Sequence, residues 1–264
     1  MTAVDRFAAG RARMHVLAHR GDARRRPENT VHALLAALAI PGCDGLEFDV
    51  RAACDGTPVI AHDETLARVF GRPDRVADLS AAELGEAGLP TLHEVLAAIP
   101  ARAFLDVELK EDVGPAVVPV LRAARGEDLA NAVVSSFDHA TVETVRRLAP
   151  GWPVWLNVLA LDQAAIADAL RLGARGVSAD EATIDAAGVE AARAAGLDVA
   201  AWTIRHVQRL AELAALGVAA VCVEDDALDS AAATVAAIAD RGPVQAGGER
   251  AGPTVTTIEG GPAG

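Results

Sequence analysis

Short apolar runs alternate with amphipathic segments along most of this 264-residue chain. The runs are rich in Val, Leu and Ala, as buried strands are, and each is followed by a segment with the period of an α-helix. The pattern predicts eight strands in the main alternation: His15–His19, Leu46–Arg51, Ala103–Lys110, Ala132–Ser135, Pro153–Val158, Gly176–Ser178, Leu197–Thr203 and Val218–Val223. The helices predicted after them are, in order, about Asn29–Ile40, Thr91–Ala98, Pro115–Arg125, Ala140–Leu148, Gln163–Leu172, Asp185–Ala195, His206–Leu216 and Ala227–Ile238.

This alternation favours one closed barrel. Strands that alternate with helices require right-handed crossovers and a parallel sheet. Eight such units in a chain of this length favour an α/β fold of the (β/α)₈ TIM-barrel type over an open, doubly wound sheet. We expect a single domain over residues 14–241, preceded by an N-terminal extension over 1–13. The tail over 242–264 is rich in Gly, Pro and Thr and is expected to be disordered.

One segment interrupts the rhythm after the second strand. Pro58–His62 reads as a short extra strand, and the glycines and prolines of residues 63–90 break any longer element. We expect an excursion over the mouth of the barrel, where it would shape access to a site.

The charge and composition of the chain limit the kinds of molecule that it is expected to bind. The formal net charge is −13, and an acidic chain is a poor ligand for nucleic acid or an anionic membrane, so neither is expected as a stable partner. The N-terminal segment lacks the apolar core of a signal peptide, and no stretch has the length of a membrane helix, so we expect a cytoplasmic location. The sequence indicates no oligomeric state.

Several common site types are disfavoured. The three cysteines, Cys43, Cys54 and Cys222, form no C-x-x-C pair, which predicts free thiols rather than a zinc ribbon or a disulfide framework. Phosphate-loop and dinucleotide motifs are absent. Gly176–Asp180 lacks the last glycine of a nucleophile elbow, which disfavours a serine hydrolase.

Acidic side chains recur at the ends of two neighbouring predicted strands. Glu47 and Asp49 lie two residues apart and therefore share a face, and Glu108 and Lys110 repeat this spacing. Carboxylates that converge in a closed interior repel one another unless one is protonated or a cation lies between them. Hard oxygen ligands favour one divalent cation, Mg²⁺ or Ca²⁺. The alternative is a set of structural salt bridges to Lys110 or Arg51.

Two histidines end predicted strands near these carboxylates. Because the imidazole pKa lies near neutrality, His19 and His62 suit paired general acid and base work. Arg20 and Lys110 would bind an anionic phosphate, although a surface salt bridge is the alternative for Arg20. Glu28 points toward the same mouth, whereas structural roles are assigned to its neighbours Pro27, Asn29 and Thr30 and to His15, His32, His93, His139 and His206.

The order of these motifs resembles that of the glycerophosphodiester phosphodiesterase family. The segments that carry the resemblance are Ala18–Thr30, Gly45–Arg68, Leu89–Leu96, Phe104–Lys110, Ser135–Pro150 and Ala200–Ile204. The resemblance implies a barrel that uses a divalent cation to hydrolyse glycerophosphodiesters, small-molecule substrates, to glycerol 3-phosphate and an alcohol. By position it implies metal ligands Glu47, Asp49 and Glu108, acid–base residues His19 and His62, phosphate contacts Arg20 and Lys110, and further site residues Glu28 and Trp202.

Two positions depart from the family pattern. Arg205 follows Trp202-Thr203-Ile204 where many members carry Asn, and Val223–Asp226 stands where many carry Thr-Asp-x-Pro. Both lie at the mouth of late strands, so they bear on recognition of the leaving group and of glycerol. Two alternatives stay open: a phosphodiesterase of lysophospholipid or other lipid-derived head groups, and a barrel that binds without catalysis.

Overall fold

The computed structural model describes residues 14–231, 233 and 234. The expected N-terminal extension, the expected tail and the end of the last predicted helix lie outside these residues. Among the described residues, no helix is long and apolar enough to cross a bilayer. All three cysteines are unpaired, as the sequence predicts.

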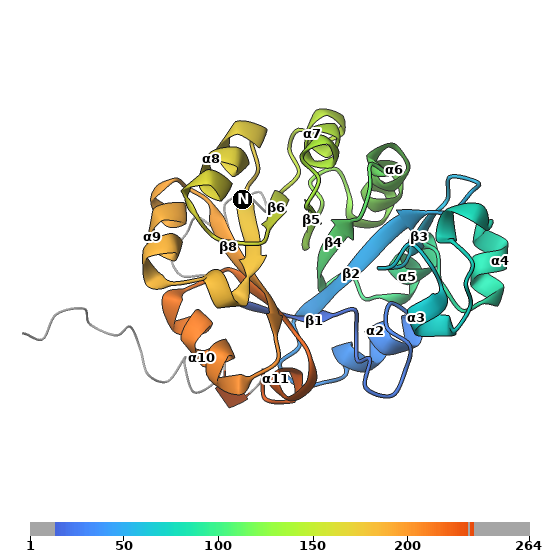
Figure 1. Cartoon of the computed structure of the whole chain (residues 1–264), viewed down its shortest axis with the longest axis horizontal. Coiled ribbons are helices and arrows are strands. Elements are labelled where there is room, and N and C mark those ends of the chain that lie inside the picture. Colours follow the sequence, from blue (N-terminus) through green and yellow to red (C-terminus); the bar gives the residue numbers. More distant parts are fainter. Residues whose placement is uncertain (1–13, 232, 235–264) are drawn as a thin grey trace, which may run out of the picture.

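Eight parallel strands close into a barrel, as expected (Figure 1). The first strand pairs with the last and also with the second, so the ring has no open edge. The strands are β1 (His15–His19), β2 (Gly45–Ala52), β4 (Phe104–Leu109), β5 (Ala132–Ser136), β6 (Val154–Val158), β7 (Gly176–Asp180), β8 (Asp198–Ile204) and β9 (Ala220–Val223). An extra strand, β3 (Pro58–Ile60), runs antiparallel to β2 on the outside of the ring.

Helices surround the barrel, and most begin at a side chain that caps their free backbone N–H groups. Thr30 accepts from Ala33 N at the first helix, and Asp162 accepts from Ala165 N at α8. The surrounding helices are α2 (Val31–Leu38), α5 (Leu92–Ala98), α6 (Gly114–Arg125), α7 (His139–Leu148), α8 (Gln163–Leu172), α9 (Ala186–Ala194), α10 (Val207–Leu216) and α11 (Asp225–Asp229).

The predicted boundaries agree closely with the structure, except at the last helix. The prediction for α8 is the observed span, and most other ends differ by one or two residues. The last helix is predicted from Ala227, whereas α11 (Asp225–Asp229) begins two residues earlier. Residues 231, 233 and 234, within the predicted span, are also helical. The acidic start of this helix carries no side-chain cap, so the sequence lacked its usual start signal.

The interruption after β3 is a folded unit. It contains α3 (Ala67–Phe70), the 3₁₀ turn η1 (Val76–Asp78) and α4 (Ala81–Glu86). Its apolar side chains form a cluster separate from the main core, and it packs beside β3 (Figure 1). None of residues 63–90 lines the main pocket, but Asp63 and Arg68 make ion pairs next to that pocket.

The side chains inside the barrel change from apolar to polar along its axis. A cluster that includes Leu17, Phe104 and Trp155 fills the interior near the amino ends of the strands. Toward the carboxyl ends the inward positions are polar or charged, for example Glu47 and Asp49 on β2. The apolar cluster closes the lower end of the barrel, so a ligand enters only from the carboxyl end, where active sites of this fold lie.

Candidate active site

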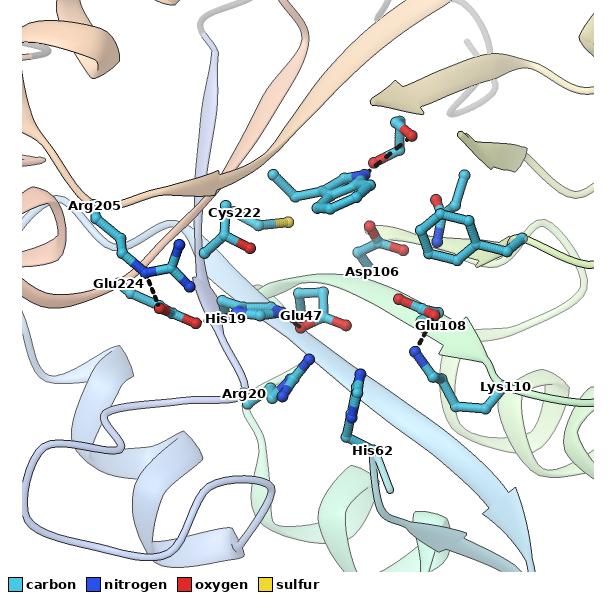
Figure 2. A pocket seen from close by; sticks show the side chains of 15 residues that line it. His19, Arg20, Glu47, His62, Asp106, Glu108, Lys110, Arg205, Cys222 and Glu224 are labelled. Atoms are coloured by element: carbon cyan, nitrogen blue, oxygen red, sulfur yellow. Dashed lines mark hydrogen bonds and ion pairs between the residues drawn. The ribbon is translucent and has the colours of Figure 1, made fainter. Parts of the chain in front are cut away.

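A pocket of about 270 Å³ opens at the carboxyl ends of the strands (Figure 2). Seven of the nine predicted site residues line it: His19, Arg20, Glu47, His62, Glu108, Lys110 and Trp202. Asp49 lies fully buried against this group, and Glu28 lies behind Arg20, with which it is paired. Residues from separate strand ends are therefore brought together by closure of the barrel.

Three carboxylates converge as the spacing predicted. Glu47, Asp49 and Glu108 each offer an oxygen, and the three oxygens lie within 4.8 Å of one another. Pairing of β2 with β4 sets Asp49 directly beside Glu108. Both Glu47 oxygens and one Asp49 oxygen are buried without a hydrogen-bond partner, as expected where a cation supplies the missing partner. Three oxygen donors without sulfur or nitrogen fit Mg²⁺ or Ca²⁺.

Burial and mutual repulsion shift the pKa values of this cluster. Burial, followed by the charge of Asp49, raises the pKa of Glu47 well above its usual value and raises that of Glu108 as well. Burial also opposes ionisation of Asp49, but the positive charges of Arg20 and Lys110 hold its pKa below the usual value. The cluster without a cation is therefore strained electrostatically.

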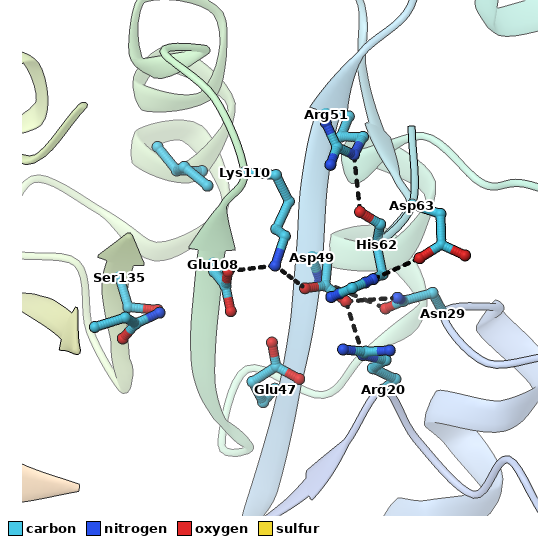
Figure 3. Close-up of polar contacts among 12 residues, drawn as sticks. Arg20, Asn29, Glu47, Asp49, Arg51, His62, Asp63, Glu108, Lys110 and Ser135 are labelled. Atoms are coloured by element: carbon cyan, nitrogen blue, oxygen red, sulfur yellow. Dashed lines mark hydrogen bonds and ion pairs between the residues drawn. The ribbon is translucent and has the colours of Figure 1, made fainter. Parts of the chain in front are cut away.

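Two basic side chains flank Asp49 (Figure 3). Arg20 Nε lies 3.1 Å from Asp49 Oδ2, and Lys110 Nζ lies 3.4 Å from Asp49 Oδ1 and 2.6 Å from Glu108 Oε1. These cations partly balance the buried negative charge. Both also line the pocket, where they provide donors for a phosphate.

Asn29, for which the sequence predicts a structural role, contacts the carboxylate cluster directly. Its Nδ2 donates to Asp49 Oδ2 at 2.8 Å, and the residue is 4% exposed. Thr30 next to it is the helix cap that was expected. Gly21 turns the same loop with a φ of +86°, and a Cβ there would lie 2.6 Å from the backbone of Ala33.

His19 is held between two carboxylates. Its Nδ1 is hydrogen-bonded to Glu224 Oε1, and its Nε2 lies 3.6 Å from Glu47 Oε2. With Nδ1 protonated and donating to Glu224, Nε2 is the nitrogen that faces the cluster. The bond to Glu224 also helps to hold the pKa of that carboxyl below its usual value, against the effect of burial. The sequence marked Glu224 only as a departure from the family pattern.

His62 is oriented in a similar way, by the acidic residue that follows it (Figure 3). Its Nδ1 lies 2.7 Å from Asp63 Oδ1, and its carbonyl accepts from Arg51 Nε at 2.8 Å. Burial lowers the pKa of this imidazole. A neutral imidazole near pH 7 is a competent base.

Glu28 acts on the site through Arg20. Its carboxylate accepts from Arg20 Nη1 at 3.0 Å and from both terminal nitrogens of Arg68, at 2.6 and 2.9 Å. Arg68 also reaches Asp63, at 2.6 Å from its Nε. The excursion thereby supports both Arg20 and the partner of His62.

The mouth of the pocket has an aromatic wall and a further cation. Phe137 and Trp202 meet edge to face with ring centroids 5.5 Å apart, and Lys110 Nζ lies 5.9 Å from the Phe137 ring. Arg205 Nε lies 2.9 Å from Glu224 Oε2, and the guanidinium extends toward the centre of the pocket (Figure 2).

Four polar residues of the lower pocket were missed from sequence: Asp106, Asn157, Ser178 and Cys222. Asp106 precedes Glu108 by two positions, so the strand period that selected Glu108 could also have found it. The others stand alone in apolar runs and carry no such signal.

Comparisons with known proteins identify the family and support the fold. A model of the glycerophosphoryl diester phosphodiesterase family matches residues 19–227. A glycerophosphodiester phosphodiesterase of Caldanaerobacter subterraneus is 28% identical over 80% of this chain and 93% of its own. A probable glycerophosphodiester phosphodiesterase 1 of Mycobacterium tuberculosis is 31% identical over 59% of this chain and 68% of its own. A phosphodiesterase of Oleispira antarctica, solved with sn-glycerol-3-phosphate, superposes with a TM-score of 0.75 at 28% identity, covering 84% of this chain and 96% of its own.

Proposed function

The chain belongs to the glycerophosphoryl diester phosphodiesterase family, which makes it a phosphoric diester hydrolase, and we propose that it hydrolyses glycerophosphodiesters to glycerol 3-phosphate and an alcohol. The observation that carries the proposal is the buried cluster of Glu47, Asp49 and Glu108, in which both Glu47 oxygens and one Asp49 oxygen lack a hydrogen bond, flanked by two oriented imidazoles. A non-catalytic barrel has no need to bury these groups together.

We assign the cation to Glu47, Asp49 and Glu108. A bound divalent cation polarises the phosphorus centre and offsets charge on the equatorial oxygens. Arg20 and Lys110 line the same space and hold the phosphate by charge and hydrogen bonds. The positive charges of Arg20 and Lys110 also reduce the repulsion between the anionic substrate and the buried carboxylates.

The two imidazoles carry the protons. One takes a proton from the nucleophile, which is either water or the neighbouring glycerol hydroxyl, and the other delivers a proton to the departing alcohol oxygen. Glu224 and Asp63 orient these rings through their Nδ1 atoms, so that Nε2 is the reactive nitrogen in each. The roles of His19 and His62 exchange if a second step follows.

A substrate panel tests the proposal. After chelation, the full chain receives Mg²⁺ or Ca²⁺ together with glycerophosphocholine, glycerophosphoethanolamine or bis(glycero)phosphate, and glycerol 3-phosphate is measured with an enzymatic assay. We expect release from at least one soluble diester, with loss of activity in EDTA. Lysophosphatidylcholine is tested in parallel by release of choline, and choline release from this lipid without hydrolysis of any soluble diester would favour the lipid alternative. Absence of release from every diester with either cation would overturn the proposal.

A further inference from the structure

The lower half of the pocket carries polar side chains that the proposed reaction does not use. Asp106 on β4 and Asn157 on β6 line it and are 2% and 5% exposed. Figure 2 shows Asp106 directed into the same space as Glu47 and Glu108. Asp106 is not a member of the cation cluster. Beneath these residues lies the apolar cluster that closes the barrel.

A short hydrogen-bond chain orients this group. Asn157 Nδ2 donates to Ser135 Oγ at 3.4 Å, and Ser135 Oγ donates to Asp106 Oδ1 at 2.6 Å. Both hydrogen bonds are donated in the direction from Asn157 to Asp106, so an oxygen that can accept a hydrogen bond remains at each end of the chain. Asn157 Oδ1 is buried and has no hydrogen-bond partner among the described residues, and the bond from Ser135 engages only one of the two Asp106 oxygens.

These two acceptor oxygens determine which functional group of a ligand can bind here. The buried Asn157 carbonyl oxygen requires a donor, because an unpaired buried acceptor is costly, and the second Asp106 oxygen can accept a further hydrogen bond. Phosphate and carboxylate supply only acceptors at neutral pH, so neither can satisfy the buried Asn157 oxygen. Two adjacent hydroxyls supply two donors without charge.

We propose that Asp106, Ser135 and Asn157 form a hydroxyl-binding subsite that accepts the vicinal diol of the glycerol moiety. This inference rests on the proposed function and deepens it. The glycerol end enters first, the phosphate stays beside Arg20 and Lys110, and the departing alcohol faces the mouth. The subsite therefore binds the glycerol moiety, which all glycerophosphodiesters share. The alcohol moiety stays outside the buried part of the pocket.

An ammonium group is the competing occupant, since it also donates hydrogen bonds and is attracted by Asp106. The neutral Asn157 oxygen at the other end of the chain contributes little to holding a full charge. A matched set of three phosphate monoesters separates the two: sn-glycerol 3-phosphate, propyl phosphate without hydroxyls, and phosphoethanolamine.

Binding of these three ligands to the cation-loaded full chain is measured by calorimetry. We expect sn-glycerol 3-phosphate to bind at least about tenfold more tightly than propyl phosphate. Asn157→Leu should remove most of this preference by weakening glycerol 3-phosphate alone. Ser135→Ala frees Asp106 to rotate and should also reduce the preference for glycerol 3-phosphate over propyl phosphate. The control is Ser136→Ala, a buried serine of the same strand whose hydroxyl donates to Leu109 O outside the pocket.

The binding results test the subsite whether or not the chain hydrolyses diesters. Equal affinity for glycerol 3-phosphate and propyl phosphate, or tighter binding of phosphoethanolamine, overturns the subsite even where diesters are hydrolysed. An equal loss for all three ligands in both variants also overturns it. A preference for glycerol 3-phosphate that depends on Asn157 or Ser135 supports the subsite even if no diester is turned over. If Asn157→Leu does not fold, Ser135→Ala decides.

Discussion

His19 Nδ1 is hydrogen-bonded to Glu224 Oε1 across the seam where the first and last strands of the barrel meet. The two residues lie 205 positions apart in sequence. A second contact, from Arg205 Nε to the other Glu224 oxygen, fixes the carboxylate at its opposite side. Both departures from the family pattern thus meet at Glu224, the hydrogen-bond partner of His19.

Glu224→Gln should lower kcat at least about tenfold and leave KM little changed, because the carboxylate of Glu224 accepts from Nδ1 of His19 and fixes the orientation of the ring. Steady-state kinetics with a soluble glycerophosphodiester measures the split, and Glu224→Asp should recover part of the loss. Glu212→Gln, on the exposed side of α10, serves as the control. An unchanged kcat in Glu224→Gln would show that the contact does not position His19.

His19→Ala and His62→Ala should each lower kcat at least about a hundredfold while the fold survives, since each removes a proton carrier but little packing. Circular dichroism and thermal unfolding check the fold, and initial rates check the activity. Turnover like that of the original chain in either variant would refute the role of that histidine.

Glu47→Gln should stabilise the cation-free protein by about 1 kcal/mol or more, because it removes a buried carboxylate whose pKa is raised by burial and by Asp49. The same change should abolish the rise in Tm that Mg²⁺ or Ca²⁺ causes in the original chain. Thermal unfolding in EDTA and in each cation measures both effects. Glu127→Gln, on the exposed surface, should change neither.

Arg68→Ala should weaken the dependence of stability on acid pH. The hydrogen bond from Arg68 lowers the pKa of Asp63 from 3.8 to about 2. A carboxyl with a depressed pKa in the folded state stabilises the fold above its unfolded pKa and loses this contribution as pH falls toward 2. Because Arg68 is half exposed, screening reduces the effect to about 1 kcal/mol.

Urea unfolding at pH 5 and near pH 2.5 measures this difference. The original chain should lose more stability between the two pH values than Arg68→Ala does. Arg72→Ala, which breaks the exposed pair with Asp74 in the same segment, should keep the full pH dependence. Identical pH dependence in Arg68→Ala and the original chain would mean that Asp63 draws its low pKa from elsewhere.

Local pattern was sufficient for the order of elements and for the convergence of most candidate site residues at one end of the barrel. Alternation along a strand places Glu47 and Asp49 on one face, and the same spacing places Glu108 beside Lys110. Parallel strands align their carboxyl ends, so residues that end different strands converge without any detail of the packing. The helix cap at Thr30 is equally local, because it spans only three residues.

Contacts between distant segments were decided only when the barrel closed. Glu224 reaches His19 because β9 pairs with β1, and Asn29 reaches Asp49 because its loop folds over β2. The hydrogen bonds from Asn157 to Ser135 and from Ser135 to Asp106 cross neighbouring strands, and nothing in the three isolated positions records their register. A sequence specifies which groups end each strand, but the closed ring determines the distances at which those groups meet.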